Sequence, residues 1–237
     1  ARGLVVGGGL FLCNSGRRGL DRRFSLHLSA RFGLGDLRLG GNLDGRDVFG
    51  LGNRGRSLAA GGIDMCTCSI PEARAMIDAG WEMATHGLKW IDYKDVPREV
   101  EADHIARAVE LHTQVTGSRP QGFYQGRASM NTVALGCEEG GFAYLADSYA
   151  DELPYWHLHD GRPQLIVPYT LDANDMRFAN GGFTNGEEFF IYLRDAFDCL
   201  YREGAQGRPR MLSIGLHCRL AGRPGRAEGV RRFLDHV

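Results

Sequence analysis

The fold of this chain is decided by residues 121–147, which have the sequence QGFYQGRASMNTVALGCEEGGFAYLAD. An apolar run at 121–124 is followed by a polar loop, a helix candidate at 131–140 and a second apolar run at 142–146. This order predicts a strand, a helix and a second strand. Strands that alternate with helices in this way are typical of a parallel sheet.

The same alternation continues on both sides of this stretch. Further helices are predicted at 69–80, 95–117 and 184–204, and further strands at 81–86, 164–170 and 210–217. Capping boxes that begin at Ser69 and Thr184, and a cap at Asp95, open these helices, and glycines end them. We therefore predict an α/β protein whose parallel sheet is either open or closed into a barrel.

Polar residues stand just past the C-terminal ends of the predicted strands. They are His86, Tyr124 with Arg127, Asp147, Asp172 with Asn174 and Asp175, and His217. Active sites of α/β barrels gather at that face of the sheet. We therefore predict a pocket there.

Three of these residues are candidates for catalysis. Taken singly, His86 and His217 are each more simply interpreted as core side chains that hydrogen-bond to backbone. Two histidines that follow strands of one parallel sheet would point into the same pocket, where an imidazole can act as a general base or bind a metal. Asp147 is either a turn-capping residue or a carboxylate that orients a histidine.

Other residues are candidates for substrate binding. Arg127, in the loop after GFYQG, is a plausible anchor for a carbonyl or ureido oxygen. Trp90 and Trp156 are either core aromatics or pocket walls.

The metal question turns on HGLKW, residues 86–90. A catalytic zinc usually has three protein ligands, and Trp90 stands where a histidine pair would place its second one. Residues 1–70 offer no convincing strand to present an early aspartate. His157 and His159 are interpreted as a poor metal pair, on the expectation that their side chains point to opposite sides of an extended segment. We therefore expect no metal and no cofactor, with zinc as the weaker alternative.

Composition excludes several classes of function. The net charge of −1 implies no general attraction to nucleic acid or to a membrane surface. No apolar run approaches the length of a membrane span. The six cysteines have irregular spacings without a C-x-x-C pair, which favours a reducing compartment, and we expect the cytoplasm.

The N-terminal segment, residues 1–70, differs from the rest of the chain. Its first 62 residues contain 16 glycines, 12 leucines and 10 arginines but no lysine or glutamate. Glycine at this density opposes helices and strands. The segment is a flexible extension, a basic arm or, as we prefer, the product of an upstream reading-frame error in GC-rich DNA. We therefore separate it from a catalytic domain at 71–237.

Residues 71–237 resemble the polysaccharide deacetylase superfamily, and most of all its allantoinase-like, metal-independent branch. The matching blocks are GWEMATHGLKWIDY, HTQVTGSRPQGFYQGRASMNT, EEGGFAYLADSYADELPYW, PYTLDANDMRF, FFIYLRDAFDCLYREG and MLSIGLHCRLAGRPGR. Metal-dependent members have His-x-x-x-His where this chain has HGLKW. The resemblance implies a distorted, incomplete (β/α) barrel. Because residues 1–70 and the ending RFLDHV depart from the family pattern, we expect its first and last units to be atypical or absent.

The resemblance also implies a site and an activity. The implied pocket is lined by His86, Trp90, Tyr124, Arg127, Asp147, Trp156, Asn174 and His217. His217 or His86, assisted by Asp147, would activate water to open the hydantoin ring of allantoin. The alternatives are a metal-dependent deacetylase of an N-acetylated polysaccharide and an inactive fragment. The expected partners are a small cyclic ureide and further copies of the chain in a homo-oligomer.

Overall fold

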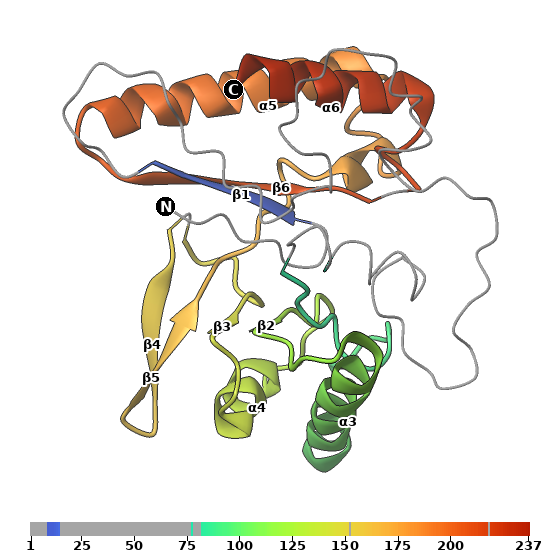
Figure 1. Cartoon of the computed structure of the whole chain (residues 1–237), viewed down its shortest axis with the longest axis vertical. Coiled ribbons are helices and arrows are strands. Elements are labelled where there is room, and N and C mark those ends of the chain that lie inside the picture. Colours follow the sequence, from blue (N-terminus) through green and yellow to red (C-terminus); the bar gives the residue numbers. More distant parts are fainter. Residues whose placement is uncertain (1–8, 15–76, 78–81, 152, 218) are drawn as a thin grey trace.

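A computed structural model of the chain describes residues 9–14, 77, 82–151, 153–217 and 219–237 (Figure 1). The strands are β1 (Gly9–Asn14), β2 (Gly122–Phe123), β3 (Tyr144–Leu145), β4 (Tyr155–His159), β5 (Arg162–Ile166) and β6 (Arg210–Gly215). The helices are α3 (Arg98–Thr116), α4 (Thr132–Glu139), α5 (Gly186–Ala205) and α6 (Pro224–His236), with a short 3-10 helix, η1 (Asp175–Phe178). The predicted α/β class is confirmed.

The sheet is rich in parallel pairs but is not closed. β2 and β5 both pair in parallel with β3, and β4 follows as an antiparallel edge strand beside β5. Isolated parallel bridges join Thr85 to Phe123 and Asn174 to Gly215, while β1 pairs antiparallel with β6. Within the described residues these strands form two separate sheets, so the expected barrel is not confirmed. Of the strand predicted at 81–86, the described residues 82–86 keep only the bridge at Thr85, and the helix predicted at 69–80 lies outside the described residues except for residue 77.

The hairpin of β4 and β5 was not predicted in full, because β4 was missed. His159 pairs with Arg162, which leaves a two-residue loop of Asp160 and Gly161. Both loop residues have positive φ, 48° and 73°. An Asp-Gly pair is favoured in such loops because its backbone twist matches the twist of the two strands. The dipeptide was the local signal for this hairpin.

Helix starts differ slightly from the predicted ones. α3 begins after Pro97 rather than at Asp95, although Gly117 ends it in the left-handed conformation as expected. The cap of α5 is Asn185, whose side chain accepts the backbone N–H groups of Glu187 and Glu188. Thr184, predicted as the cap, instead bonds through its N–H and hydroxyl to the carboxylate of Glu188. None of the described helices combines the length and hydropathy needed to cross a membrane.

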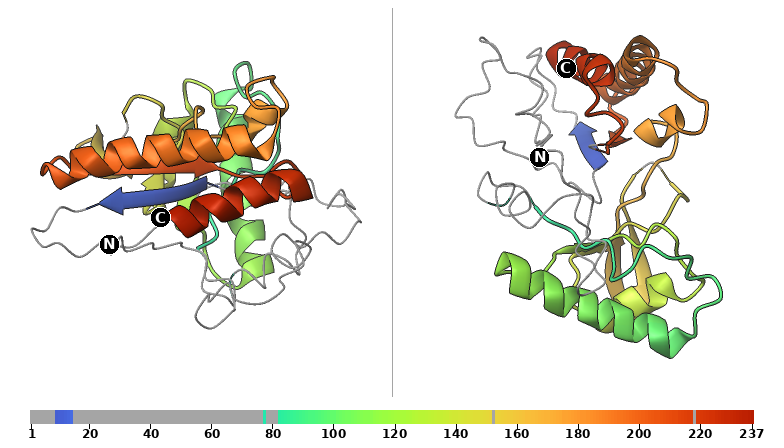
Figure 2. Two further views of the ribbon diagram at one scale, coloured as in Figure 1. Left: turned by 90° about the horizontal axis from the view of Figure 1, so that it is seen from above. Right: turned by 90° about the vertical axis from the view of Figure 1, so that its right-hand side faces the viewer.

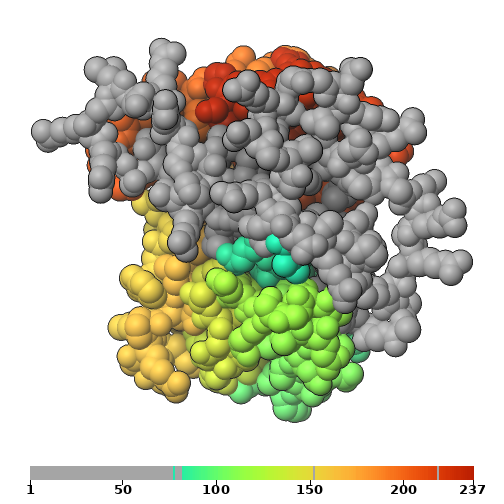
Figure 3. Space-filling model, viewed as in Figure 1, coloured from blue at the N-terminus to red at the C-terminus, as the bar shows by residue number. Residues whose placement is uncertain are grey.

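Three clusters of buried side chains hold these elements together. The largest joins α5 and α6 to β6, so both helices cover the β1–β6 ribbon (Figures 1 and 2). A second cluster joins α3 and α4 to β2, β3 and β5. These elements make up the lower half of the face in Figure 3. The third cluster brings Tyr124 and Tyr144 together with Tyr169 and Met211, and so connects the four-stranded sheet to β6.

The packing of α5 makes a prediction about stability. The side chain of Leu193, on α5, is fully buried against the neighbouring elements, whereas Ile191 on the same helix is 37% exposed. We expect Leu193→Ala to lower the free energy of unfolding by about 2–5 kcal/mol, because it leaves a cavity in the core. Urea unfolding measures the loss. Ile191→Ala is the matched control, and an equal loss in both variants would contradict this packing.

Candidate active site

The first group of predicted site residues surrounds His86, which directly follows the bridge residue Thr85. The His86 ring meets the edge of Trp90 with ring centroids 4.7 Å apart, and lies 5.0 Å from the ring of Tyr124. Tyr124 directly follows β2 and is buried. The parallel bridge between Thr85 and Phe123 places these two strand ends side by side. Three predicted site residues are thus brought together by strand pairing.

The loop after β2 passes close to His86 because residue 126 is glycine. Gly126 has a φ of +79°, and a Cβ atom there would lie 2.9 Å from Trp90 Cζ3 and 3.0 Å from His86 Cε1. Any side chain would therefore displace one of these rings. Arg127 follows, with its guanidinium carbon 5.2 Å from the centroid of the Trp90 ring, a cation–π contact. The Tyr93 N–H donates to the Arg127 carbonyl at 3.1 Å and fixes the loop.

A buried carboxylate fastens the far end of this loop to α3. Glu101 has no exposed surface, and its two oxygens accept hydrogen bonds from the hydroxyls of Ser129, at 2.6 Å, and Thr132. Thr132 is the first residue of α4. The loop that carries Arg127 is therefore held at both ends.

Asp147 follows β3 and organises the start of the same loop. Its carboxylate accepts the backbone N–H groups of Gln125 at 2.5 Å and Gly126 at 2.7 Å. Burial raises the pKa of Asp147 to about 6, although the two backbone hydrogen bonds favour the charged form. Asp147 therefore changes its charge close to neutral pH.

An open depression of about 410 Å³ lies over this loop. It is lined by Asp92, Lys94, Gly126, Arg127, Ala128, Asp147 and Tyr149. The hydroxyl of Tyr149 lies 3.0 Å from that of Tyr124, so the depression adjoins the aromatic group around His86. Two basic side chains, Lys94 and Arg127, and two carboxylates, Asp92 and Asp147, therefore line the same space.

The second group of site residues is centred on Asp175 and His217. Asp175 is completely buried, and its carboxylate accepts the backbone N–H groups of His217 at 2.7 Å and Ala221 at 2.9 Å. The same carboxylate lies 2.6 Å from His217 Nδ1. Because a carboxylate only accepts, Nδ1 carries the proton in this contact and Nε2 of the neutral ring is left as an acceptor.

Aromatic and amide contacts connect the two groups. The rings of Tyr124 and Tyr169 stack with centroids 4.5 Å apart. The Tyr169 hydroxyl accepts a hydrogen bond of 2.9 Å from the Asn174 side chain, whose oxygen caps η1 at Met176 N–H. Asn174 precedes Asp175 and bridges to Gly215, two residues before His217. A continuous series of contacts therefore runs from His86 to His217.

The structure brings some of the predicted site residues together and gives others a different place or role. Asp147 makes its described hydrogen bonds to the β2 loop, and the carboxylate beside His217 is Asp175. Asn174 is buried and supports η1. Trp156 is 67% exposed on the edge strand β4 and does not line the depression. Sequence reasoning had placed Asp175 at a strand end without giving it a role, and it missed Lys94 and Tyr149.

The interpretation of His157 and His159 as residues on opposite sides of a strand was wrong. Residues two apart in a strand share a face, because side chains alternate with a period of two. The two rings lie on the same side of β4, with centroids 6.5 Å apart and planes 28° apart.

Known proteins resemble this chain in both sequence and structure, although no protein-family model matches it. A Schizosaccharomyces pombe protein named "Putative polysaccharide deacetylase" is 43% identical over 180 residues, which are 69% of this chain and 56% of that protein. Two crystal structures, of a PuuE allantoinase and of a probable polysaccharide deacetylase from Pseudomonas aeruginosa, each share 50% identity and a TM-score of 0.68. Each match covers 70% of this chain and 56% of the other.

A third structure, from Mycobacterium smegmatis, shares the fold at 21% identity with a TM-score of 0.60. The chain spans 56% of the length of the fission yeast protein and of the allantoinase structure. The assignment to a family rests on this overall similarity of sequence and structure. On that similarity, the chain belongs to the polysaccharide deacetylase superfamily.

Proposed function

We propose that this chain belongs to a hydrolase that opens the ring of a cyclic ureide such as allantoin. The observation that carries this proposal is the buried Asp175 carboxylate, which holds the His217 ring through Nδ1. A histidine held in this tautomer presents Nε2 as a general base. The 50% identity to a protein called an allantoinase supports the choice of substrate.

The proposed reaction needs one activated water. His217 Nε2 accepts a proton as the water oxygen bonds to a ring carbonyl carbon. Collapse of the tetrahedral intermediate breaks the carbon–nitrogen bond, and the proton moves from His217 to the leaving nitrogen. The products are a carboxyl group and an amino group of the opened ureide. General-base catalysis of this kind typically contributes about 10²–10⁴-fold.

Basic side chains in the depression can stabilise the negative charge that this reaction creates. Attack on a carbonyl produces an oxyanion, and the opened product carries a carboxylate. Arg127 and Lys94 both line the depression, together with the carboxylates of Asp92 and Asp147. Cations placed where negative charge develops favour the transition state over the neutral substrate.

A metal held as in the metal-dependent branch does not fit the residues around His86. Position 90, where that branch has its second histidine, is Trp90, and an indole ring offers no metal-ligating lone pair. The edge contact between Trp90 and His86 and the cation–π contact from Arg127 fill that side of the imidazole. We therefore derive no step through a metal at this position.

Deacetylation is the second candidate function, because two relatives carry names of that kind. Besides the fission yeast protein, a Gibberella zeae protein named "Peptidoglycan deacetylase-like protein FGM2" is 29% identical over 105 residues. Both candidates hydrolyse an amide-type carbon–nitrogen bond. They differ in whether the bond lies in a small ring or in an N-acetyl group.

The His217 proposal predicts a loss of turnover in two variants. His217→Ala removes the base and Asp175→Asn removes the charge that orients it, so each should lower kcat for allantoin by about 10²–10⁴-fold. Turnover of the unmodified chain should withstand a chelator. Allantoin consumption, with circular dichroism to confirm folding, measures both effects.

A matched histidine–aspartate pair on the surface provides the control. His236 Nε2 lies 2.9 Å from Asp198 on the exposed side of α5 and α6. His236→Ala should leave kcat unchanged. Unchanged allantoin turnover in a folded His217→Ala variant would contradict the proposed role, and release of acetate from N-acetylated glycan oligomers instead of allantoin turnover would favour the deacetylase.

The raised pKa of Asp147 predicts that the free energy of unfolding depends on pH between about 4 and 6. Burial raises its pKa from 3.8 to about 6, so the unfolded chain releases the proton first as the pH rises. Ionisation in this window therefore destabilises the fold. We therefore expect the difference in unfolding free energy between Asp147→Asn and the unmodified chain to change with pH. Between about pH 4 and about pH 7 it should shift in favour of the variant by up to ~3 kcal/mol. Urea unfolding of both proteins measures this, and parallel pH profiles would contradict it.

A further inference from the structure

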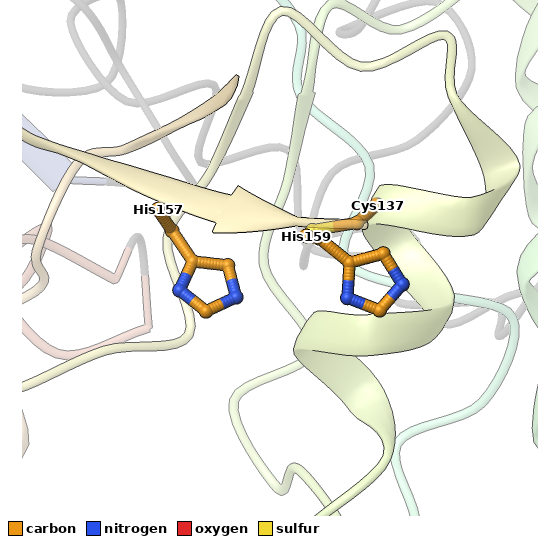
Figure 4. A group of neighbouring side chains, drawn as sticks. All are labelled: Cys137, His157 and His159. Atoms are coloured by element: carbon orange, nitrogen blue, oxygen red, sulfur yellow. The ribbon is translucent and has the colours of Figure 1, made fainter. Parts of the chain in front are cut away.

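The inner face of β4 carries two histidines next to a cysteine of α4. His157 and His159 are half-buried, while Trp156 and Leu158 between and beside them are 67% and 69% exposed on the other face. Cys137, near the end of α4, packs against the buried cluster beneath the sheet. Figure 4 shows both imidazole rings on the same side of β4, with Cys137 on the adjoining helix.

The ligand atoms of these side chains converge. One nitrogen from each ring and the Cys137 sulfur all lie within 4.8 Å of one another. In a tetrahedral zinc site, with bonds of about 2.3 Å to sulfur and about 2.0–2.1 Å to nitrogen, ligand atoms lie on the order of 3.5 Å apart. Metal binding in this group therefore requires the side chains to turn toward one another.

One ring nitrogen in this group is shielded from solvent without a hydrogen bond. His159 Nε2 is buried and makes no hydrogen bond to any part of the chain that the structure describes. The carboxylates of Glu138 and Asp160 lie at ion-pair distance from it, 3.5 Å and 3.7 Å away. A buried polar atom without a hydrogen bond is costly, and these carboxylates or a bound ion can offset that cost.

We propose that Cys137, His157 and His159 form a binding site for a transition-metal ion of the zinc class. A thiolate and two imidazoles are borderline-soft ligands, which zinc accepts and which magnesium and calcium avoid. Three protein ligands leave a fourth position for water, and the nearby Glu138 carboxylate can orient the His159 ring. None of the three residues lines the depression beside Arg127, so this site is independent of the proposed hydrolysis.

Such an ion would join α4 and β4, which otherwise meet through side-chain packing and the His159–Glu138 contact. β4 is the edge strand of the four-stranded sheet, and its other long side is unpaired within the described residues. A bond from the metal to Cys137 would fasten this edge to α4. Because the ion binds only the folded arrangement, it would stabilise the fold by mass action.

Cobalt provides the probe, because Co²⁺ takes the place of zinc and its thiolate complexes absorb light. We expect Co²⁺ titration of the full, reduced chain to produce a thiolate-to-cobalt charge-transfer band with an endpoint of one ion per chain. Cys137→Ser should abolish this band. His157→Ala should weaken Co²⁺ binding at least tenfold, because even the loss of a residue that only orients a ligand typically costs about 10–100-fold. Zn²⁺ should displace Co²⁺, and Mg²⁺ should not.

Two variants serve as controls, in which one thiol or one histidine outside this site is removed. Cys199 is exposed on α5 and His236 lies on α6, so Cys199→Ser and His236→Ala should leave the titration unchanged. Zn²⁺ should raise the Tm of these controls and of the unmodified chain but not that of Cys137→Ser. Absence of the band in the unmodified chain, or its survival in folded Cys137→Ser, would overturn the proposal.

Discussion

The buried carboxylate of Asp175 is the interaction on which the His217 side of the site depends. A carboxylate removed from water costs several kcal/mol unless hydrogen bonds replace its hydration. Two backbone N–H groups and the His217 ring supply that replacement. The same bonds tie η1 to the turn that follows β6 and leads into α6. The hydrogen bonds that stabilise this region therefore also orient the ring of His217.

The two halves of the site are held by different chemistry. Around His86, glycine at position 126 allows the loop to approach two aromatic rings, and Asp147 fixes that loop through backbone N–H groups. Around His217, charge and hydrogen bonds dominate. The stacked rings of Tyr124 and Tyr169 join these halves and bury the surface between them. A substitution in this aromatic contact would therefore disturb both halves together.

Local patterns predicted the α/β class and the neighbours of His86, because parallel pairing brings successive strand ends to one edge. They did not identify Asp175 as the partner of His217, since that contact depends on how η1 packs against the end of β6. β4 was missed although its Asp-Gly turn was visible, and the cap of α5 moved from Thr184 to Asn185. The family resemblance gave the orienting role to Asp147, whereas the carboxylate beside His217 is that of Asp175.

The tautomer of His217 tests the central claim most directly. Nitrogen-15 NMR of the imidazole rings, with His217→Ala to assign the signals, reports which ring nitrogen carries the hydrogen at a pH where the ring is neutral. The account predicts hydrogen on Nδ1 of His217, and loss of that preference in Asp175→Asn. Hydrogen on Nε2, with Nδ1 unprotonated beside Asp175, would contradict it.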